Sequence, residues 1–375
     1  MKYYLWGIFV FVLFANTSKA QNIDSAAQIE VNGYIDTYYG FDNNKPTNGN
    51  RPYAIASARH NDFALNLAML DMKYTSQRIR ARFAPAFGTY MNSNYAAEQG
   101  SLRNIVEASA GVRLSAKKEI WLDAGVINSP IGYENAISKN QLLYSRSLSA
   151  EFSPYYLAGV KLSIPVTKTL KARVYVVNGW QQITDVNHKK SVILNLEYKP
   201  SQWTINASVY YGDERNLGSV NLRNRTFFDA NATYIHKAFK TQFGASYGTQ
   251  KSFRGNSDIT SHWWQANVAA RYSFTNKVSL SARAELFDDE NEVVAMVVTP
   301  SSSFYCSSYT IGVNYNITSN ALFRFETRAY FADEKIFYNP NRGIVESSVV
   351  GLVSLVINFG TSFTVKQPSN YTNGN

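Results

Sequence analysis

Stretches in which every second residue is apolar recur along this chain from Ile29 to Phe359. Residues 170–177 read LKARVYVV, and residues 278–286 read VSLSARAEL. A β-strand with this pattern has one apolar face and one polar face, because successive side chains point to opposite sides. A soluble β-sandwich shows the same alternation, so the choice of fold depends on the ends of the chain and on its loops.

The first 20 residues have the features of an export signal. Lys2 precedes an apolar run from Leu5 to Ala15, and Ser18-Lys19-Ala20 fits a small-x-small cleavage site. The run is too short to cross a bilayer as a helix, and position 21 is not the cysteine that a lipid anchor requires. We therefore predict a signal peptide over 1–20 and an exported mature domain over 21–375.

The gaps between the alternating stretches fall into two length classes. We predict sixteen strands: 29–41, 62–74, 78–90, 103–115, 119–128, 155–165, 169–179, 190–199, 202–212, 226–237, 239–250, 262–274, 277–287, 304–317, 321–332 and 346–359. Short turns alternate with long loops near 42–61, 91–102, 129–154, 180–189, 213–225, 251–261, 288–303 and 333–345. Strict alternation of this kind is typical of a closed up-and-down barrel, with tight periplasmic turns and longer external loops.

The pattern therefore predicts an all-β protein, a single antiparallel transmembrane barrel of the bacterial outer membrane. About sixteen strands would be wide enough to hold an aqueous channel, and a polar tail, 360–375, would follow them. Strand 62–74 is ambiguous, because Leu65 and Leu67 compete with Leu70 for the lipid face. Aromatic residues make up 14% of the chain, and eight near strand ends are expected in the interfacial girdles: Trp180, Trp203, Trp264, Tyr156, Tyr198, Tyr211, Tyr247 and Tyr315.

Several local motifs point to one family. Residues 128–141 read NSPIGYENAISKNQ, followed by YSRSL at 144–148 and AEFSPYY at 150–156. Supporting segments are NDFALN at 61–66, NYAAE at 94–98 and NGWQ at 178–181. Together they resemble the OmpL-like β-barrel porins, the second β-barrel porin family of Bacteroidota-type bacteria. The resemblance implies an outer-membrane pore but no particular substrate, and Pro130 stands where many relatives are expected to have histidine.

The long loop 129–154 is the candidate constriction of such a pore. It carries Glu134, Lys139, Arg146 and Glu151. In large porins an external loop folds into the lumen, and opposed charges line the narrowed passage. The alternative is that these charges pair with the barrel wall and simply hold the loop down.

A second candidate is a basic stripe on strand 78–90. Arg78, Arg80 and Arg82 share one face, which cannot be the lipid face, since each would cost roughly 2–4 kcal/mol near the midplane. Arg113 lies on the next strand, with Glu107 on the same face. The stripe predicts an anion-attracting wall. The alternative is neutralisation by Glu107, Asp123 and neighbouring carboxylates.

Other function classes find little support in the sequence. The net charge is +10, or +8 without Lys2 and Lys19, but the basic residues are scattered rather than clustered as in nucleic-acid binding. The four histidines form no His-Glu-x-x-His motif, and a Gly-x-Ser-x-Gly elbow is absent. We therefore predict no enzyme activity, no cofactor and no metal centre. The cluster Asp288-Asp289-Glu290 with Glu292 is either a solvated charge run or a cation site that bridges lipopolysaccharide.

The sequence thus predicts a porin for passive diffusion of ions and small polar solutes, with a preference for anions. Its expected surroundings are outer-membrane lipid and lipopolysaccharide. A closed barrel with a structural or adhesive role is the alternative, and the sequence leaves open whether the barrel forms a homo-oligomer.

Overall fold

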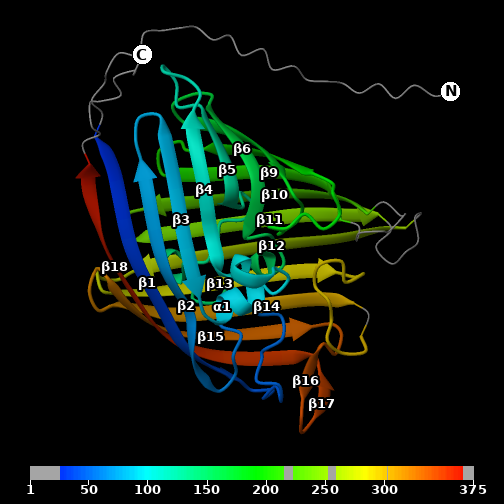
Figure 1. Ribbon diagram of the computed structural model, residues 1–375. Coiled ribbons are helices and arrows are strands. Elements are labelled where there is room, and N and C mark those ends of the chain that lie inside the picture. The colour runs from blue at the N-terminus through cyan, green and yellow to red at the C-terminus, as the bar shows by residue number, and fades with distance from the viewer. Residues whose placement is uncertain (1–25, 215–222, 252–258, 302, 366–375) are drawn as a thin grey trace, which may run out of the picture.

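A computed structural model describes residues 26–214, 223–251, 259–301 and 303–365 (Figure 1). The predicted signal peptide and positions 366–375 lie outside the described residues. Sixteen strands form one closed antiparallel barrel in which each strand pairs with its neighbours in the chain, and β1 closes the barrel against β18. The barrel strands are β1 (Ala27–Asp42), β2 (Asp62–Thr75), β3 (Ile79–Phe87), β4 (Ile105–Arg113), β5 (Trp121–Asn128), β6 (Tyr156–Pro165), β7 (Leu170–Val177), β8 (Ser191–Tyr198), β9 (Trp203–Asp213), β10 (Asn224–His236), β11 (Phe239–Lys251), β12 (Thr260–Ser273), β13 (Val278–Asp289), β14 (Phe304–Asn316), β15 (Ala321–Ala332) and β18 (Ser347–Val365).

The prediction of a sixteen-stranded antiparallel barrel is confirmed. The largest difference is at the last strand, which runs to Val365 instead of ending at Phe359, because β1 continues to pair with it as far as Ala27. The first part of the predicted tail is therefore strand. The long loop before β18 also contains a small separate hairpin, formed by β16 (Phe337–Asn339) and β17 (Gly343–Val345).

A β-bulge resolves the ambiguous register of β2. The pairing with β1 shifts between Asp36 and Thr37, so that Leu67 lies opposite Asp36 while Leu65 lies opposite Thr37. The extra residue lets Leu65 and Leu70 both face outward, 39% and 43% exposed, while Leu67 is buried inside. The lipid-facing side of this strand was ambiguous in the sequence because the prediction assumed regular alternation, which the bulge interrupts.

The two faces of the barrel have opposite polarity. The outward face carries exposed apolar residues such as Leu194, Ile311 and Phe325. The inward face buries polar and charged residues such as Asn195, Glu285 and Arg328. This is the reverse of a soluble protein, in which large apolar side chains gather inside. Among the described residues, none of the helices has the length and apolar character of a membrane-spanning segment.

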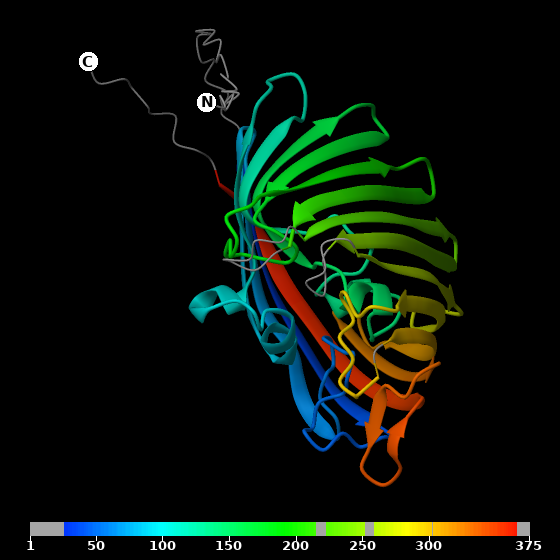
Figure 2. The ribbon, with the colours of Figure 1, turned by 90° about the vertical axis from the view of Figure 1, so that its right-hand side faces the viewer.

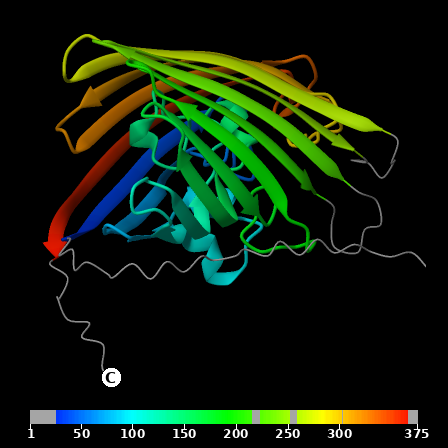
Figure 3. The same cartoon turned by 90° about the horizontal axis from the view of Figure 1, so that it is seen from above.

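Short helical segments lie in the long loops. They are α1 (Thr89–Asn94) and η1 (Gly100–Asn104) between β3 and β4, and η2 (Ser138–Asn140) and α2 (Leu148–Glu151) between β5 and β6. Residues 129–155, which we call the inward loop, lie inside the curve of the sheet (Figures 2 and 3). The inside of the barrel is therefore partly filled by the chain's own loop.

Two of the eight aromatic residues expected in the girdles lie inside instead. Tyr156 is 1% exposed and stacks on Tyr95, with ring centroids 4.0 Å apart. Trp180 packs edge-on against Tyr210 and Phe227. Tyr156 is the first residue of β6 and Trp180 lies in the loop between β7 and β8, and the inward direction of a side chain at such positions cannot be read from its closeness to a strand end.

Candidate functional site

The inward loop is held by buried arginines of the opposite wall. Arg283 on β13 donates hydrogen bonds to the carbonyl oxygens of Ser145 (2.9 Å) and Arg146 (3.0 Å). Arg328 on β15 donates to the same Arg146 oxygen at 2.6 Å. Arg324, also on β15, donates to the carbonyl oxygens of Ser138, Gln141 and Leu143. These bonds satisfy loop carbonyls that lie outside the sheet, and the Ser138 carbonyl also accepts the Gln141 N–H at the end of η2.

Carboxylates of the same wall accept from the loop backbone. Glu326 accepts the N–H groups of Tyr144 (2.5 Å) and Ser145 (3.1 Å), and Glu285 accepts that of Leu148 (2.6 Å). Glu285 also pairs with Arg283 and Arg328. Because charge-assisted hydrogen bonds are roughly twice as strong as neutral ones, this wall fixes the loop in one position.

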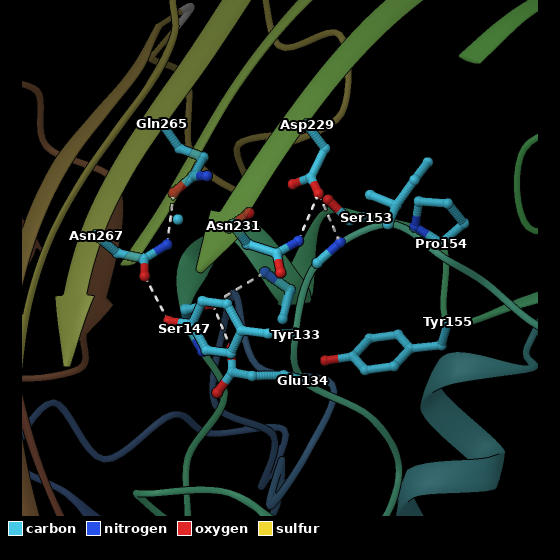
Figure 4. A pocket seen from close by; sticks show the side chains of 15 residues that line it. Tyr133, Glu134, Ser147, Ser153, Pro154, Tyr155, Asp229, Asn231, Gln265 and Asn267 are labelled. Atoms are coloured by element: carbon cyan, nitrogen blue, oxygen red, sulfur yellow. Dashed lines mark hydrogen bonds between the residues drawn. The ribbon is translucent and has the colours of Figure 1, made fainter. Parts of the chain in front are cut away.

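A small cavity separates the loop from β10 and β12 (Figure 4). Its volume is about 20 Å³, and Tyr133, Glu134, Asp229 and Asn267 are among its lining residues. Asp229 accepts the backbone N–H of Gly132 at 3.1 Å, and Tyr133 donates its hydroxyl to Asn267. The loop therefore contacts the wall on this side too.

The four predicted loop residues mostly hold the loop itself. Arg146 is fully buried and donates to the carbonyl oxygens of Asn135, Ala136 and Tyr144. Glu134 accepts from the Ser147 N–H at 2.8 Å and lies 3.5 Å from Arg283. Lys139 reaches the short-turn end of the barrel, where its ammonium donates to the carbonyl oxygen of Ser319 at 2.7 Å. These contacts match the alternative in which the charges tie the loop down.

Glu151, the fourth, lies in α2 at the long-loop end. Its carboxylate accepts the backbone N–H of Ile55 at 2.6 Å and so joins the inward loop to the loop between β1 and β2. Burial raises the pKa of the Glu151 carboxyl from its ordinary 4.5 to about 7, against the opposing effects of the Ile55 N–H and of Arg328.

This pKa predicts a specific pH dependence of stability. The folded state holds the Glu151 proton more tightly than the unfolded state. The protonated carboxyl therefore contributes its full stabilisation to the fold below about pH 4.5, and this stabilisation is lost as the pH rises through about 7. Glu151→Gln keeps the acceptor but cannot ionise. Thermal unfolding at pH 5 and pH 8 should show the variant gaining stability relative to the wild type at the higher pH. Parallel pH profiles of the two proteins would contradict the shift.

The predicted basic stripe lines a second space, the inner chamber, at the short-turn end of β2–β7. This cavity of about 450 Å³ is lined by six basic residues and three carboxylates. The basic residues are Lys73, Arg80, Arg82, Lys161, Lys171 and Arg173, and the carboxylates are Glu107, Glu119 and Asp123. The lining is therefore cationic on balance.

Most of these charges are paired. Arg80 makes a two-point contact with Asp123, with both distances 2.6 Å, and its guanidinium lies 4.3 Å above the Trp121 ring. Arg82 bridges Asp71 (2.7 Å) and Glu107 (2.6 Å). The carboxylates that were expected from the sequence to neutralise the stripe are thus in contact with it. Among the six basic residues of the chamber, Lys171 forms no salt bridge within the described part of the chain.

The third stripe residue, Arg78, and Arg113 of the next strand lie outside the chamber lining. Arg78 precedes the first residue of β3 and is exposed in the short turn, where its carbonyl oxygen accepts the Arg113 N–H at 2.9 Å. Arg113 forms a salt bridge with Glu119 at 2.8 Å. The structure thus brings Arg80, Arg82 and Glu107 together and leaves Arg78 outside the group.

The acidic cluster after β13 has a local structural role. Asp289 is fully buried and accepts the N–H groups of Val293, Val294 and Ala295, while Asp288 accepts from the indole of Trp264. Within the described ranges, no three histidine, cysteine, aspartate or glutamate residues group as they would around a metal ion. Asp289 therefore shapes a turn, and its carboxylate oxygens are already bonded.

Comparison with known proteins identifies the family. The sequence model described as "Putative beta-barrel porin-2, OmpL-like" matches residues 28–359, nearly the whole described barrel. The chain belongs to this OmpL-like porin family. It is therefore an outer-membrane barrel, with its short turns on the periplasmic side and its long loops outside. No curated protein matches the sequence of this porin.

Solved porin structures share the fold at low sequence identity. OmpT, an outer-membrane protein of Vibrio cholerae, has a TM-score of 0.57 and 11% identity, over 89% of this chain and 98% of that one. The anion-selective porin from Comamonas acidovorans has a TM-score of 0.59 and 10% identity, over 89% and 100%. The outer-membrane channel DcaP of Acinetobacter baumannii has a TM-score of 0.59 and 9% identity, over 89% and 97%. At these identities the likeness establishes the fold alone.

Sequence reasoning missed the role of the wall opposite the chamber. Arg271, Arg283, Glu285, Arg324, Glu326 and Arg328 had the alternation of lumen residues, but nothing in the pattern showed that the loop covers them. It also missed Arg225, which lies at the outer end of β10 beside two tryptophan rings.

Proposed function

We propose that this porin is a passive diffusion channel for ions and small polar solutes, with a preference for anions. The observation that carries the proposal is the inner chamber, a cationic space of about 450 Å³ inside a sixteen-stranded barrel. Diffusion needs no catalytic group: a hydrated passage narrowed by the inward loop sorts solutes by size and charge. That a porin of the same fold is named anion-selective supports the preference.

Proteoliposome swelling tests the diffusion function. Vesicles that contain the folded porin should swell in isotonic solutions of a small neutral sugar such as arabinose, and much more slowly in the trisaccharide raffinose. Equal vesicles without protein control for leakage. A verified folded barrel that causes no swelling in arabinose would favour the closed structural or adhesive barrel, a role that the dense contacts of the inward loop also fit.

The assembly of the porin is a separate proposal. A trimer form of OmpT from Vibrio cholerae shares the fold, with a TM-score of 0.59 and 10% identity. We propose that this porin also forms a homo-oligomer. Analytical ultracentrifugation of the detergent-solubilised protein should give a mass of three chains, and a single-chain mass would refute the proposal.

A further inference from the structure

A second cavity, the outer cavity, lies at the external end of the barrel. Its volume is about 500 Å³, which is in the range of pockets that hold small organic molecules. Four external loops line it through residues 53–55, 151–153, 180–181 and four residues of 293–298. Arg225, the second residue of β10, lines it from the barrel wall. The loops that meet here come from strands on opposite sides of the barrel, so the cavity lies at the external end of the barrel interior.

An unusually apolar loop segment forms one wall of the outer cavity. Residues 293–298 read VVAMVV, in a loop on the external side, where polar residues are the rule. Val293 and Ala295 are buried, whereas Met296 and Val298 are 73% and 68% exposed. Exposed apolar groups that line a concave site favour a ligand with an apolar part.

The segment is held in place without a ligand. The Asp289 carboxylate accepts three successive N–H groups, from Val293 to Ala295, at 2.8–2.9 Å. The Tyr53 hydroxyl accepts the Val298 N–H at 3.3 Å and donates to the Ile336 carbonyl at 2.8 Å. A wall that is ordered in advance costs a ligand less conformational entropy on binding.

The opposite wall presents a cation framed by aromatic rings. The Arg225 guanidinium lies 4.8 Å from the centroid of Trp180 and 5.5 Å from that of Trp263. Trp263 is packed over Gly248, where an added Cβ would come within 2.1 Å of the ring, and stacks with Phe227. These packing contacts fix the rings, and through them the guanidinium, in one orientation.

Arg225 has donors to spare. Its side chain is 7% exposed, and its Nε donates to Gln250 at 2.8 Å, but no carboxylate of the described ranges forms a salt bridge with it. Asp289 interacts with it electrostatically, while the oxygens of Asp289 serve the loop backbone. A buried guanidinium that has unused N–H donors and no paired carboxylate is strongly stabilised when an anionic ligand accepts its hydrogen bonds.

We propose that the outer cavity binds small organic monoanions with an apolar, preferably aromatic, body and one carboxylate. The carboxylate would meet Arg225, and the body would lie between Trp180 and the segment 293–298. Glu151 lines the same cavity and, when it is ionised above about pH 7, disfavours a second negative group, so a dianion would bind less well at pH 8. The inference names a class of solutes for the proposed diffusion channel. Its relevance to transport rests on the proposed function, but the binding itself can be measured without transport.

Calorimetry on the porin in phosphatidylcholine nanodiscs tests the proposal, with empty nanodiscs as the blank. The probe 3-phenylpropionate should bind more tightly than propionate, than neutral 3-phenylpropanamide and than dianionic phenylsuccinate. Arg225→Gln should weaken 3-phenylpropionate binding roughly ten-fold or more and leave the amide unchanged, because a charged hydrogen bond is lost. The double variant Met296→Ser/Val298→Ser, at exposed positions, should weaken both ligands to a similar degree.

The matched control is Val186→Ser, an exposed valine in the loop between β7 and β8 that is not itself among the cavity-lining residues, although Trp180 of the same loop is. It should bind like the wild type. Absence of 3-phenylpropionate binding to the folded wild type, or equal loss of acid and amide binding in Arg225→Gln, would overturn the proposal. A porin that conducts but does not bind the probe refutes this inference alone. One that binds but does not conduct refutes the diffusion function alone.

Discussion

Shortening the inward loop should raise the single-channel conductance roughly two-fold or more, because the loop occupies much of the lumen cross-section. Asn128 and Tyr156 are paired across β5 and β6, so a four-residue Gly-Ser linker can replace residues 130–154 without moving either strand. The wall that the loop now covers is polar, with Arg283, Glu285 and Arg328 among its residues, and water can solvate it once the loop is gone. The barrel should therefore still fold.

A matched control shortens a loop that lies outside the lumen. Replacing 340–342, the tip between β16 and β17, by two glycines alters an external hairpin and should leave the conductance unchanged. If the shortened inward loop gave wild-type conductance in a barrel verified by circular dichroism, the loop would not be the constriction.

Reversing the charge of Lys171 should move the ion selectivity away from anions. Its side chain faces the inner chamber, and it forms none of the salt bridges of the described residues. Glu197 acts on it only electrostatically while bonding Arg173 and Lys199, so the Lys171 charge is available to passing ions. Lys171→Glu turns a lining of six cations and three carboxylates into one of five and four. The reversal potential in a KCl gradient should shift toward the potassium potential, and Lys171→Gln should give about half of that shift.

Lys168→Glu controls for net charge, because Lys168 is exposed in the short turn and does not line the chamber. This variant should keep the wild-type reversal potential at moderate salt, where screening limits distant charges. Equal shifts from both positions would mean that the chamber does not determine selectivity. An unchanged reversal potential for Lys171→Glu would place the chamber outside the conduction path.

The strand pattern could be predicted well because it reflects a strong physical constraint. Outward residues of a barrel meet lipid and inward ones meet water or polar groups, so the period of two persists across all strands. The prediction from this pattern was incomplete at β2, where the bulge opposite Asp36 and Thr37 breaks the period of two. It was also wrong about the end of β18, because that end depends on pairing with β1 rather than on the composition of β18 itself.

The candidate site could be predicted only in part. Alternation placed Arg78, Arg80 and Arg82 on one inner face; Arg80, Arg82 and Glu107 line the chamber, whereas Arg78 lies in the short turn outside it. It could not say which charges pair with each other, because pairing depends on neighbours such as Asp71 that are close only across the sheet. Nor could it show that Arg283 and Arg328 face a loop instead of water, since burial by a distant segment leaves no trace in strand periodicity.

Single-channel recording of the refolded wild-type protein in a planar bilayer with a KCl gradient tests the central claim most directly. A water-filled, cationic passage predicts stable conductance steps whose current reverses toward the chloride potential. Steps that reverse toward the potassium potential would keep the channel and contradict the role of the inner chamber. A verified folded barrel that gives no steps would contradict the diffusion function itself.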